Sequence, residues 1–533
     1  MLSLFGEALS SVVFPRDSSH IVDTGYAKFR GNFTEPFSLA FLGVPYAEPP
    51  VGDLRFRAPV PLDTEKLKGN GGVIDATSYP NFCVQGSIGE GDAGGAGSED
   101  CLKINIYTPV NATSKSKLPV LFYIHGGGYV YGNPRNWPFE HWINQSPNVV
   151  VVSVYYRLDS FGFLAHPDFS NPSIADLNAG MKDQLLALRW VHDNIEAFGG
   201  DPDQVTINGQ SAGGGSVEIH MIANEGSEKL FSGAIAQSVD REILPLPEQQ
   251  EPLFDFYAEQ AGCGGLSSVS ATVSCLRKAS ISALARAQDA GASFNGSLYN
   301  KWRPVVDGSL IPDYPTKLLA EGRFLHVPLI AGATSNETGG GTNNLTAVLH
   351  PAYPLLNAAE LEKFNQVYNP AQFSSEEEWI RTATGEPGLR CGREMMGAAG
   401  VKNSKAWTYR YNQPNPTQNE PGITEHAAEN WMMFLGTNTG TNGSTVFTGL
   451  DPVETAFSEE LIAYWLSFVR TKDPNTFKLE RSPFWPDFST NKRAVLQQDQ
   501  QNETRASSIF VEEEDAAKSR CAFVASVVEH MQD

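Results

Sequence analysis

Short apolar runs alternate with helical patterns along most of this 533-residue chain. Residues 118–124 (LPVLFYI) and 148–156 (NVVVVSVYY) are continuous apolar runs, as expected for strands that are buried on both faces. From 178 to 199 the apolar residues recur at helical spacing. Further strands are predicted at 205–208, 231–237, 326–332 and 407–411, and an amphipathic helix at 458–470. Strands that alternate with helices predict an α/β fold with a mostly parallel sheet.

No internal repeat and no long linker interrupts the pattern. Length alone would favour two to four domains, although this is a weak guide. Residues 41–59 (FLGVPYAEPPVGDLRFRAP) are rich in proline and glycine, and they predict an ordered, turn-heavy segment at the surface.

The composition indicates a soluble globular protein, with 41% hydrophobic and 19% charged residues. No run of 18 or more apolar residues occurs, so no integral membrane segment is expected. The net charge of −22 disfavours nucleic acid and anionic membrane surfaces as partners. The sequence does not indicate an oligomeric state.

Two features favour the secretory route. The even number of cysteines fits three disulfides, for which the sequence alone allows 15 pairings: Cys83, Cys101, Cys263, Cys275, Cys391 and Cys521. Eight glycosylation sequons also occur, at Asn32, Asn111, Asn144, Asn295, Asn336, Asn344, Asn442 and Asn502. The first residues, MLSLFGEALSSVVFP, make a poor signal peptide because they lack a basic start and Glu7 interrupts the apolar run. We nevertheless expect a secreted protein.

Residues 209–213 (GQSAG) match the pattern GxSxG directly after a predicted strand. In this pattern the serine, here Ser211, sits on a strained strand-to-helix turn that exposes its hydroxyl at the top of a sheet. The start of the following helix would add positive potential where an oxyanion forms. An ordinary glycine-rich turn is the alternative, since so short a pattern recurs by chance.

A second glycine cluster, His125 to Gly128 (HGGG), follows the predicted strand 118–124. Consecutive glycines let backbone N–H groups approach a substrate oxygen without hindrance from side chains. Together with a downstream GxSxG, HGGG is typical of a hydrolase in which these groups bind an oxyanion. A flexible turn is the competing interpretation.

At this point the chain resembles the carboxylesterase/cholinesterase family of α/β-hydrolases, the type-B carboxylesterases and lipases, and among them a fungal-type esterase. The resemblance rests on segments spread over nearly the whole chain: FLGVPYAEPPVGDLRF, SEDCLKINIY, HGGGY, NVVVVSVYYRL, AFGGDPDQVTINGQSAGG and PVVDG. It implies a single α/β-hydrolase domain over residues 1–533, with a large mostly parallel sheet flanked by helices and with long loop and helical insertions. It further implies the disulfides Cys83–Cys101 and Cys263–Cys275, which leaves Cys391–Cys521 as the third.

The resemblance also implies a catalytic triad in the order serine, acid, histidine. Ser211 matches the nucleophile, and Glu337, after the predicted strand 326–332, matches the acid. Asp307 in PVVDG is a competing acid, but its family counterpart is structural. His426 matches the base, although the family's usual glycine after this histidine is replaced by Ala427.

The implied mechanism is hydrolysis of a small-molecule ester. Ser211 attacks the carbonyl with His426 as base, while Glu337 orients the imidazole. The N–H groups of Gly127, Gly128 and Ala212 would bind the oxyanion, and water would then release the acid. No cofactor and no metal is expected, and no cysteine or histidine cluster has metal-ligand spacing.

Two departures from the family favour soluble short- to medium-chain esters as substrates. The segment 83–101 is short and glycine-rich, so it predicts no amphipathic lid helix of the kind that lipases use. It also lacks the tryptophan that stacks on choline, and Gln210 stands where cholinesterases carry glutamate. A lipase or sterol esterase, a non-catalytic adhesion protein of this family and an acyl transferase remain alternatives.

Overall fold

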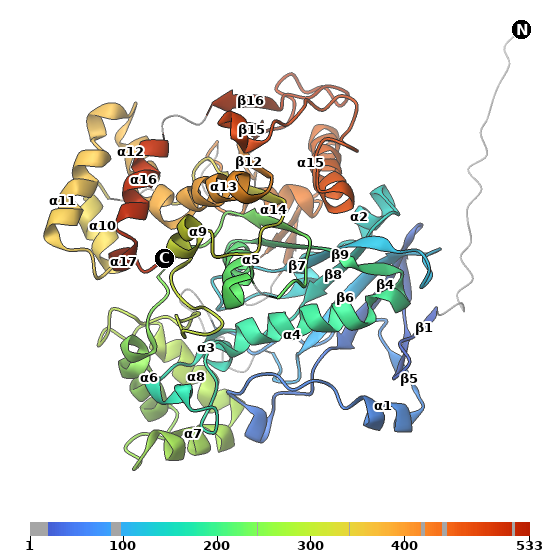
Figure 1. Cartoon of the computed structure of the whole chain (residues 1–533), viewed down its shortest axis with the longest axis vertical. Coiled ribbons are helices and arrows are strands. Elements are labelled where there is room, and N and C mark those ends of the chain that lie inside the picture. Colours follow the sequence, from blue (N-terminus) through green and yellow to red (C-terminus); the bar gives the residue numbers. More distant parts are fainter. Residues whose placement is uncertain are drawn as a thin grey trace, which may run out of the picture.

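The computed structural model describes residues 20–86, 97–226, 228–241, 243–339, 342–416, 422–439, 445–513 and 517–533. Over these residues, an eleven-stranded sheet forms the centre of the molecule, in the order β16-β15-β12-β11-β10-β9-β7-β8-β6-β4-β3 (Figure 1). Its strands are β3 (Asn32–Glu35), β4 (Ser38–Pro45), β6 (Lys103–Pro109), β7 (Leu118–Ile124), β8 (Val150–Val154), β9 (Gly200–Gln210), β10 (Gly233–Gln237), β11 (Leu329–Thr334), β12 (Ala406–Tyr411), β15 (Lys492–Leu496) and β16 (Phe510–Glu513).

The middle of the sheet is parallel, from β8 through β7, β9, β10, β11 and β12 to β15. Antiparallel strands extend it on both sides, β6, β4 and β3 at one edge and β16 at the other. The predicted α/β fold with a mostly parallel sheet is therefore confirmed. Strand β7 coincides with the predicted run, and the other predicted strands differ from the observed ones only at their ends.

Alternate residues of β7 pack into different hydrophobic clusters, which explains why its sequence is apolar throughout. Phe122 and Ile124 belong to the larger cluster, and Leu121 and Tyr123 belong to a second one on the other face. The first face is covered by α4 (Ala179–Asn194), α5 (Ala212–Ile222), α9 (Pro315–Glu321) and α13 (Cys391–Asn403). The second is covered by α2 (Glu140–Gln145), α14 (Ala428–Met433) and α15 (Pro452–Thr471).

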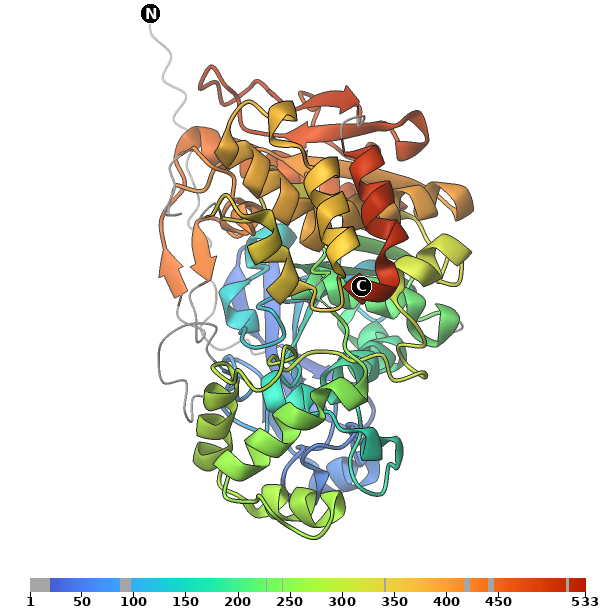
Figure 2. The same cartoon turned by 90° about the vertical axis from the view of Figure 1, so that its left-hand side faces the viewer.

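Two helical insertions lie beside the sheet (Figures 1 and 2). One consists of α6 (Pro247–Gln260), α7 (Val269–Lys278) and α8 (Ile281–Gly291). The other has its own hydrophobic cluster and contains α10 (Leu345–Ala352), α11 (Ala358–Val367), α12 (Glu376–Gly385), α16 (Lys518–Ser526) and α17 (Val528–Met531). The remaining α-helices and strands are α1 (Thr64–Asn70), α3 (Asp159–Phe163) and the small strands β1 (Ile21–Asp23), β2 (Lys28–Arg30), β5 (Val73–Asp75), β13 (Thr437–Thr439) and β14 (Thr445–Phe447).

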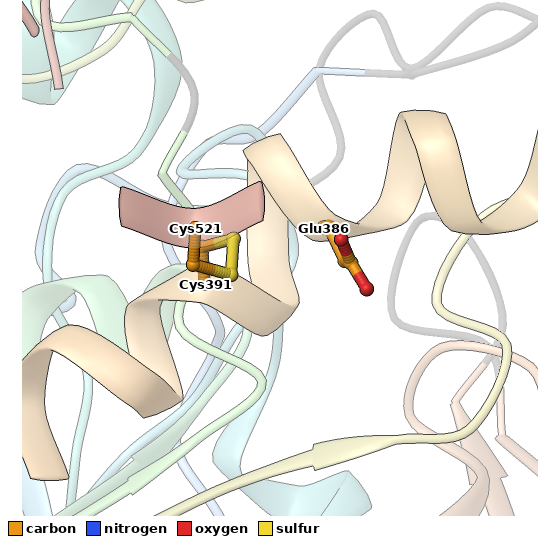
Figure 3. A group of neighbouring side chains, drawn as sticks. All are labelled: Glu386, Cys391 and Cys521. Carbon is orange, nitrogen blue, oxygen red and sulfur yellow. A yellow bond between two sulfur atoms is a disulfide. The ribbon is translucent and has the colours of Figure 1, made fainter. Parts of the chain in front are cut away.

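The structure contains three disulfides: Cys83–Cys101, Cys263–Cys275 and Cys391–Cys521. The first two are the pairs that the family resemblance implies, and the third joins the two cysteines that remain. Figure 3 shows the third bridge, between α13 and α16, with Glu386 close by. The three side chains are near enough to share a metal ion, but the sulfurs are bonded to each other and supply no thiolate. The Glu386 carboxylate accepts two hydrogen bonds from Arg520, at 2.7 and 2.6 Å. Glu386 and the disulfide therefore stabilise the position of α16.

The prediction of a surface segment at 41–59 is wrong in its first part. Residues Ser38–Pro45 form β4, which lies between β3 and β6 and is mostly buried. Gly43 has a φ of 78° at an irregularity in the pairing with β6, so a residue taken as a turn signal instead marks a bulge inside a strand.

Three predictions concern residues outside the described ones: the poor signal peptide at the start of the chain, the central part of segment 83–101, residues 87–96, and the sequon at Asn442. Within the described part of the chain, no helix combines the length and the apolar character that a membrane crossing requires.

Candidate active site

Ser211 lies between the end of β9 and the start of α5, at the carboxyl edge of the parallel strands. Its φ of 60° and ψ of −126° are unusual for a residue with a side chain, as expected for a strained strand-to-helix turn. The Ser211 N–H donates to the carbonyl of Gln237 on β10 at 2.9 Å, and this bond fixes the turn against the neighbouring strand.

The glycines of the GxSxG segment are required by close backbone contacts. A Cβ at Gly209 would overlap the carbonyl of Gly213, and a Cβ at Gly213 would overlap the carbonyl of Ile124 at the end of β7. Ser211 therefore rises from a turn whose two sides touch the sheet and the helix directly. This is the strained strand-to-helix turn that the pattern predicts.

The HGGG segment folds into a tight loop after β7. Gly127 and Gly128 have φ values of 112° and 61°, which lie in the region that glycine tolerates best. The carbonyl of Gly127 accepts the N–H groups of Val130 and Tyr131, at 3.0 and 3.2 Å, so the loop turns back on itself. Both glycines line the same cavity as Ser211.

Buried side chains hold this loop in place. The His125 ring contacts the carbonyl of Gly126 at 2.8 Å and stacks on Tyr156, whose hydroxyl donates to the His125 carbonyl. Burial lowers the pKa of His125 to about 4, so the ring is neutral at physiological pH. At the far end of the loop, the Gly132 N–H donates to Gln85 Oε1 at 2.7 Å.

Three side chains from distant parts of the chain meet at the mouth of the loop. His426 Nε2 lies 2.8 Å from Ser211 Oγ, and His426 Nδ1 lies 2.6 Å from Glu337 Oε2. Glu337 follows β11 and is buried, and its Oε1 accepts the Thr334 N–H at 2.6 Å. The structure thus brings the predicted serine, histidine and acid into one hydrogen-bonded chain.

The charges of the pair support each other. Burial opposes ionisation of Glu337, but the hydrogen bond and the charge of His426 outweigh it, so the pKa of Glu337 is below its ordinary value. Burial likewise disfavours the imidazolium of His426, whereas Glu337 and, more weakly, Glu429 raise its pKa above 6.5. A base of this kind is well matched to proton transfer near neutral pH.

A second group of polar side chains surrounds the histidine. Gln210 Nε2 lies 3.5 Å from His426 Nε2, and Asn430 Nδ2 donates to Gln210 Oε1 at 3.0 Å. Glu429 is buried on α14, and burial together with the charge of Glu337 raises its pKa to about 7. No motif in the sequence marked Asn430 or Glu429, which join the site only because α14 begins beside His426.

The competing acid of the sequence analysis has a structural role. Asp307 Oδ1 accepts hydrogen bonds from the N–H groups of Ser309 and Ile311, and Oδ2 accepts one from Asn178 Nδ2.

Ala427 has a φ of 63°, which explains why glycine is the family's usual residue after the histidine that corresponds to His426.

These groups open into a cavity of about 620 Å³, within the size range of small-molecule sites. Part of its wall is apolar and comes from the insertion around α10 and α12, with Val348, Leu349, Tyr353 and Leu389. A serine hydroxyl that lines a pocket with an apolar wall, beside a histidine, suits the hydrolysis of an ester with an apolar acyl or alkyl part.

The parallel sheet, the strained turn at the end of β9 and the glycine loop after β7 define an α/β-hydrolase. More narrowly, the model of the carboxylesterase family matches residues 18–523, so the chain belongs to the carboxylesterase family. It is a carboxylic-ester hydrolase.

Known relatives agree with this assignment. Carboxylesterase 1C of Mus musculus is 32% identical over 522 residues, which cover 88% of this chain and 87% of the mouse protein. Carboxylesterase 1D of Rattus norvegicus is 30% identical over 535 residues, and the aligned region covers 91% of this chain and 90% of the rat protein. The crystal structure of Aspergillus niger EstA superposes with a TM-score of 0.83 at 30% identity, over 97% of this chain and 99% of that one.

Proposed function

We propose that this carboxylesterase acts through a triad of Ser211, His426 and Glu337. The observation that carries the proposal is the position of the His426 ring, with one nitrogen 2.8 Å from the serine oxygen and the other 2.6 Å from the carboxylate. His426 takes the proton of Ser211 as the oxygen attacks the ester carbonyl, and it then gives that proton to the leaving alcohol.

The oxyanion is bound by the N–H groups of Gly127, Gly128 and Ala212. In support, Gly127 and Gly128 line the cavity beside the serine, and Ala212 begins α5, where N–H groups have no partner within the helix. Water, activated by the same histidine, attacks the acyl-enzyme and releases the carboxylic acid. Transfer of the acyl group to another alcohol would share the acyl-enzyme.

The substrates we propose are soluble esters with short- to medium-length chains. A cavity of about 620 Å³ with both polar and apolar walls suits such molecules. A chain-length series of p-nitrophenyl esters tests this, and we expect kcat/KM to peak at short or medium chains. Strong activity on long-chain triglyceride emulsions, with activation at the interface, would favour a lipase or sterol esterase instead.

Labelling with a serine-directed organophosphate tests the triad. We expect one adduct per chain, on Ser211, with loss of activity, and no adduct in Ser211→Ala. An intact Ser211→Ala variant that keeps ester hydrolysis would contradict the proposal. Failure of the wild-type protein to react would favour the non-catalytic adhesion branch of the fold.

We further propose a single domain over residues 1–533 and a secreted glycoprotein. The three disulfides support export, because such bonds persist in oxidising compartments. Among the described residues, the exposed sequon asparagines are Asn32, Asn111, Asn295, Asn344 and Asn502. Mass spectrometry before and after enzymatic removal of N-glycans tests this, and an unchanged mass for protein secreted from a eukaryotic host would refute it.

A further inference from the structure

One part of the cavity wall is polar, although ester hydrolysis by the triad uses none of its groups. Asp159, at the start of α3, and Gln288, on α8, both line the cavity that contains Ser211. They are 3% and 1% exposed. Asp289, the next residue on α8, also lines the cavity. Polar groups so deeply buried require hydrogen-bond partners. The groups that lack a partner within the protein therefore indicate the chemistry of a ligand that could bind at this wall.

Gln288 is fixed with its amide oxygen fully used. Its Oε1 accepts both the N–H and the hydroxyl of Ser160, at 3.1 and 2.7 Å. The Ser160 hydroxyl is also within 3.1 Å of the Tyr257 hydroxyl, which fixes it further. Among the residues that the structure describes, Gln288 Nε2 has no hydrogen-bond partner. The amide therefore carries two buried N–H donors that nothing in the described chain satisfies.

Asp159 is held in place at a conformational cost. Its φ of 52° lies in the left-handed region that residues with a side chain rarely adopt, and its N–H donates to the carbonyl of Tyr129 at 2.7 Å, directly after the oxyanion glycines. Within the described residues, its Oδ1 accepts no hydrogen bond. A strained backbone that carries a buried, unsatisfied carboxyl group is typical of a functional position.

Gly86 shows that the two groups lie close together. A Cβ at this position would overlap Asp159 Oδ2 and would come within 3.2 Å of Gln288 Nε2. Only a residue without a side chain leaves room here for both the carboxyl and the amide. The contact between Ser160, the neighbour of Asp159, and Gln288 joins residues that are 128 positions apart, so the arrangement depends on the tertiary fold.

We propose that Asp159 and Gln288 form a specificity subsite that binds a hydroxyl group carried by the ester substrate, an inference that rests on the proposed function. A hydroxyl donates one hydrogen bond and accepts others, so its proton can go to Asp159 and its lone pairs can take the Gln288 N–H. An alkyl group at the same place would leave these polar groups without partners, which disfavours plain esters relative to hydroxylated ones.

The protonation state of the carboxyl fits a neutral ligand. Burial, together with the charge of Asp289, raises the pKa of Asp159 well above its ordinary value. Burial therefore favours the neutral carboxylic acid, which offers one donor and one acceptor. An acid and an amide that are both uncharged complement an alcohol without the desolvation cost of a buried ion.

The test uses two pairs of esters that differ by one terminal hydroxyl, one pair on each side of the ester bond. The acyl pair is p-nitrophenyl hexanoate and p-nitrophenyl 6-hydroxyhexanoate, and the alcohol pair is ethyl hexanoate and 2-hydroxyethyl hexanoate. We expect the wild-type enzyme to prefer the hydroxylated member of at least one pair by about tenfold in kcat/KM, as one or two net hydrogen bonds allow.

Asp159→Gly is the decisive variant because glycine keeps the backbone conformation without strain and removes the carboxyl. We expect its preference to fall to near one, through a higher KM for the hydroxylated ester, so that kcat/KM falls more for the hydroxylated member of the pair than for the plain one. Asp159→Asn retains a donor and an acceptor, and should keep most of the preference.

Three results would overturn the subsite: no preference in the wild-type enzyme, an unchanged preference in Asp159→Gly, or an equal loss on both members of a pair together with a lower Tm, which indicates a structural role. A failure of the proposed function is distinct, because the wild-type enzyme would then hydrolyse neither the plain nor the hydroxylated esters and would not be labelled at Ser211.

Discussion

The contact between Glu337 and His426 gives the sharpest prediction about the mechanism. Two fixed N–H groups point at the carboxylate, one from His426 Nδ1 at 2.6 Å and one from the Thr334 backbone, also at 2.6 Å. Glu337→Gln keeps the shape but offers one oxygen in place of two. The backbone donor cannot move, so the amide oxygen will face Thr334 and the NH₂ group will face His426.

The imidazole must then accept at Nδ1 and carry its proton at Nε2, where it donates to Ser211 and cannot act as the base. Loss of the correct tautomer through the same kind of change costs about 10⁴-fold in kcat in serine proteases. We expect a loss of 10³- to 10⁴-fold in kcat for p-nitrophenyl butyrate, or about 4–5.5 kcal/mol at 1.36 kcal/mol per tenfold.

The pH profile separates this mechanism from simple damage. In the proposed mechanism neutral His426 is the active form, so kcat/KM should fall as the pH drops through its pKa, which Glu337 holds above 6.5. Without the carboxylate, burial dominates and the pKa falls, so the acid limb of the residual activity moves to lower pH. A matched control is Glu360→Gln. Glu360 Oε1 also contacts the Nδ1 of a histidine, His530, at 2.7 Å, but this pair has no part in the proposed mechanism.

We expect Glu360→Gln to keep wild-type kcat, since glutamine can also complete the capping box of α11. The reasoning is refuted if folded Glu337→Gln, with an unchanged near-UV circular dichroism spectrum, retains kcat within tenfold of wild type. The acid of the triad would then have to be another residue.

Three further predictions concern the surroundings of the site. Ala427→Gly should raise the free energy of unfolding by about 0.5–1 kcal/mol, because the φ of 63° strains alanine. Urea denaturation measures this gain, and its absence would show that the turn relaxes. Glu429→Gln should shift the acid limb of kcat/KM to lower pH by up to about one unit, since its charge raises the pKa of His426; a shift to higher pH would contradict this. Asp183→Asn should destabilise the protein by about 3–5 kcal/mol, because it leaves the buried Arg157 guanidinium without its carboxylate; a Tm equal to that of wild type would show that the pair is dispensable.

The sequence predicts the parallel part of the sheet well because those strands are buried on both faces. A run such as Leu118–Ile124 has to be apolar throughout, and it cannot be mistaken for a surface segment. Ser38–Pro45 is also buried, but its proline and glycine gave the stronger local signal. Its burial comes from β3 and β6, and β6 lies more than 50 residues further along the chain, where no local pattern records it.

The same distinction applies to the site. Ser211 and the glycine loop stand in short motifs whose backbone needs are local, so the sequence indicates them directly. Asn430 and Gln288 carry no motif, because they enter the cavity only through the packing of α14 and α8. The glycine expected after His426 is absent, and the structure supplies the reason for the expectation, a left-handed turn that alanine adopts here.

The bond between Cys391 and Cys521 has a practical consequence for making the enzyme. It closes a stretch of 130 residues, and the segment η7 (Glu386–Arg390), which supplies Gly388 and Leu389 to the substrate cavity, directly precedes the first of these cysteines. A host that keeps thiols reduced would produce chains in which this side of the catalytic chamber is not fastened. Production should therefore use a route through an oxidising compartment, and the yield of active enzyme should follow the completeness of this bridge more closely than the yield of soluble chain.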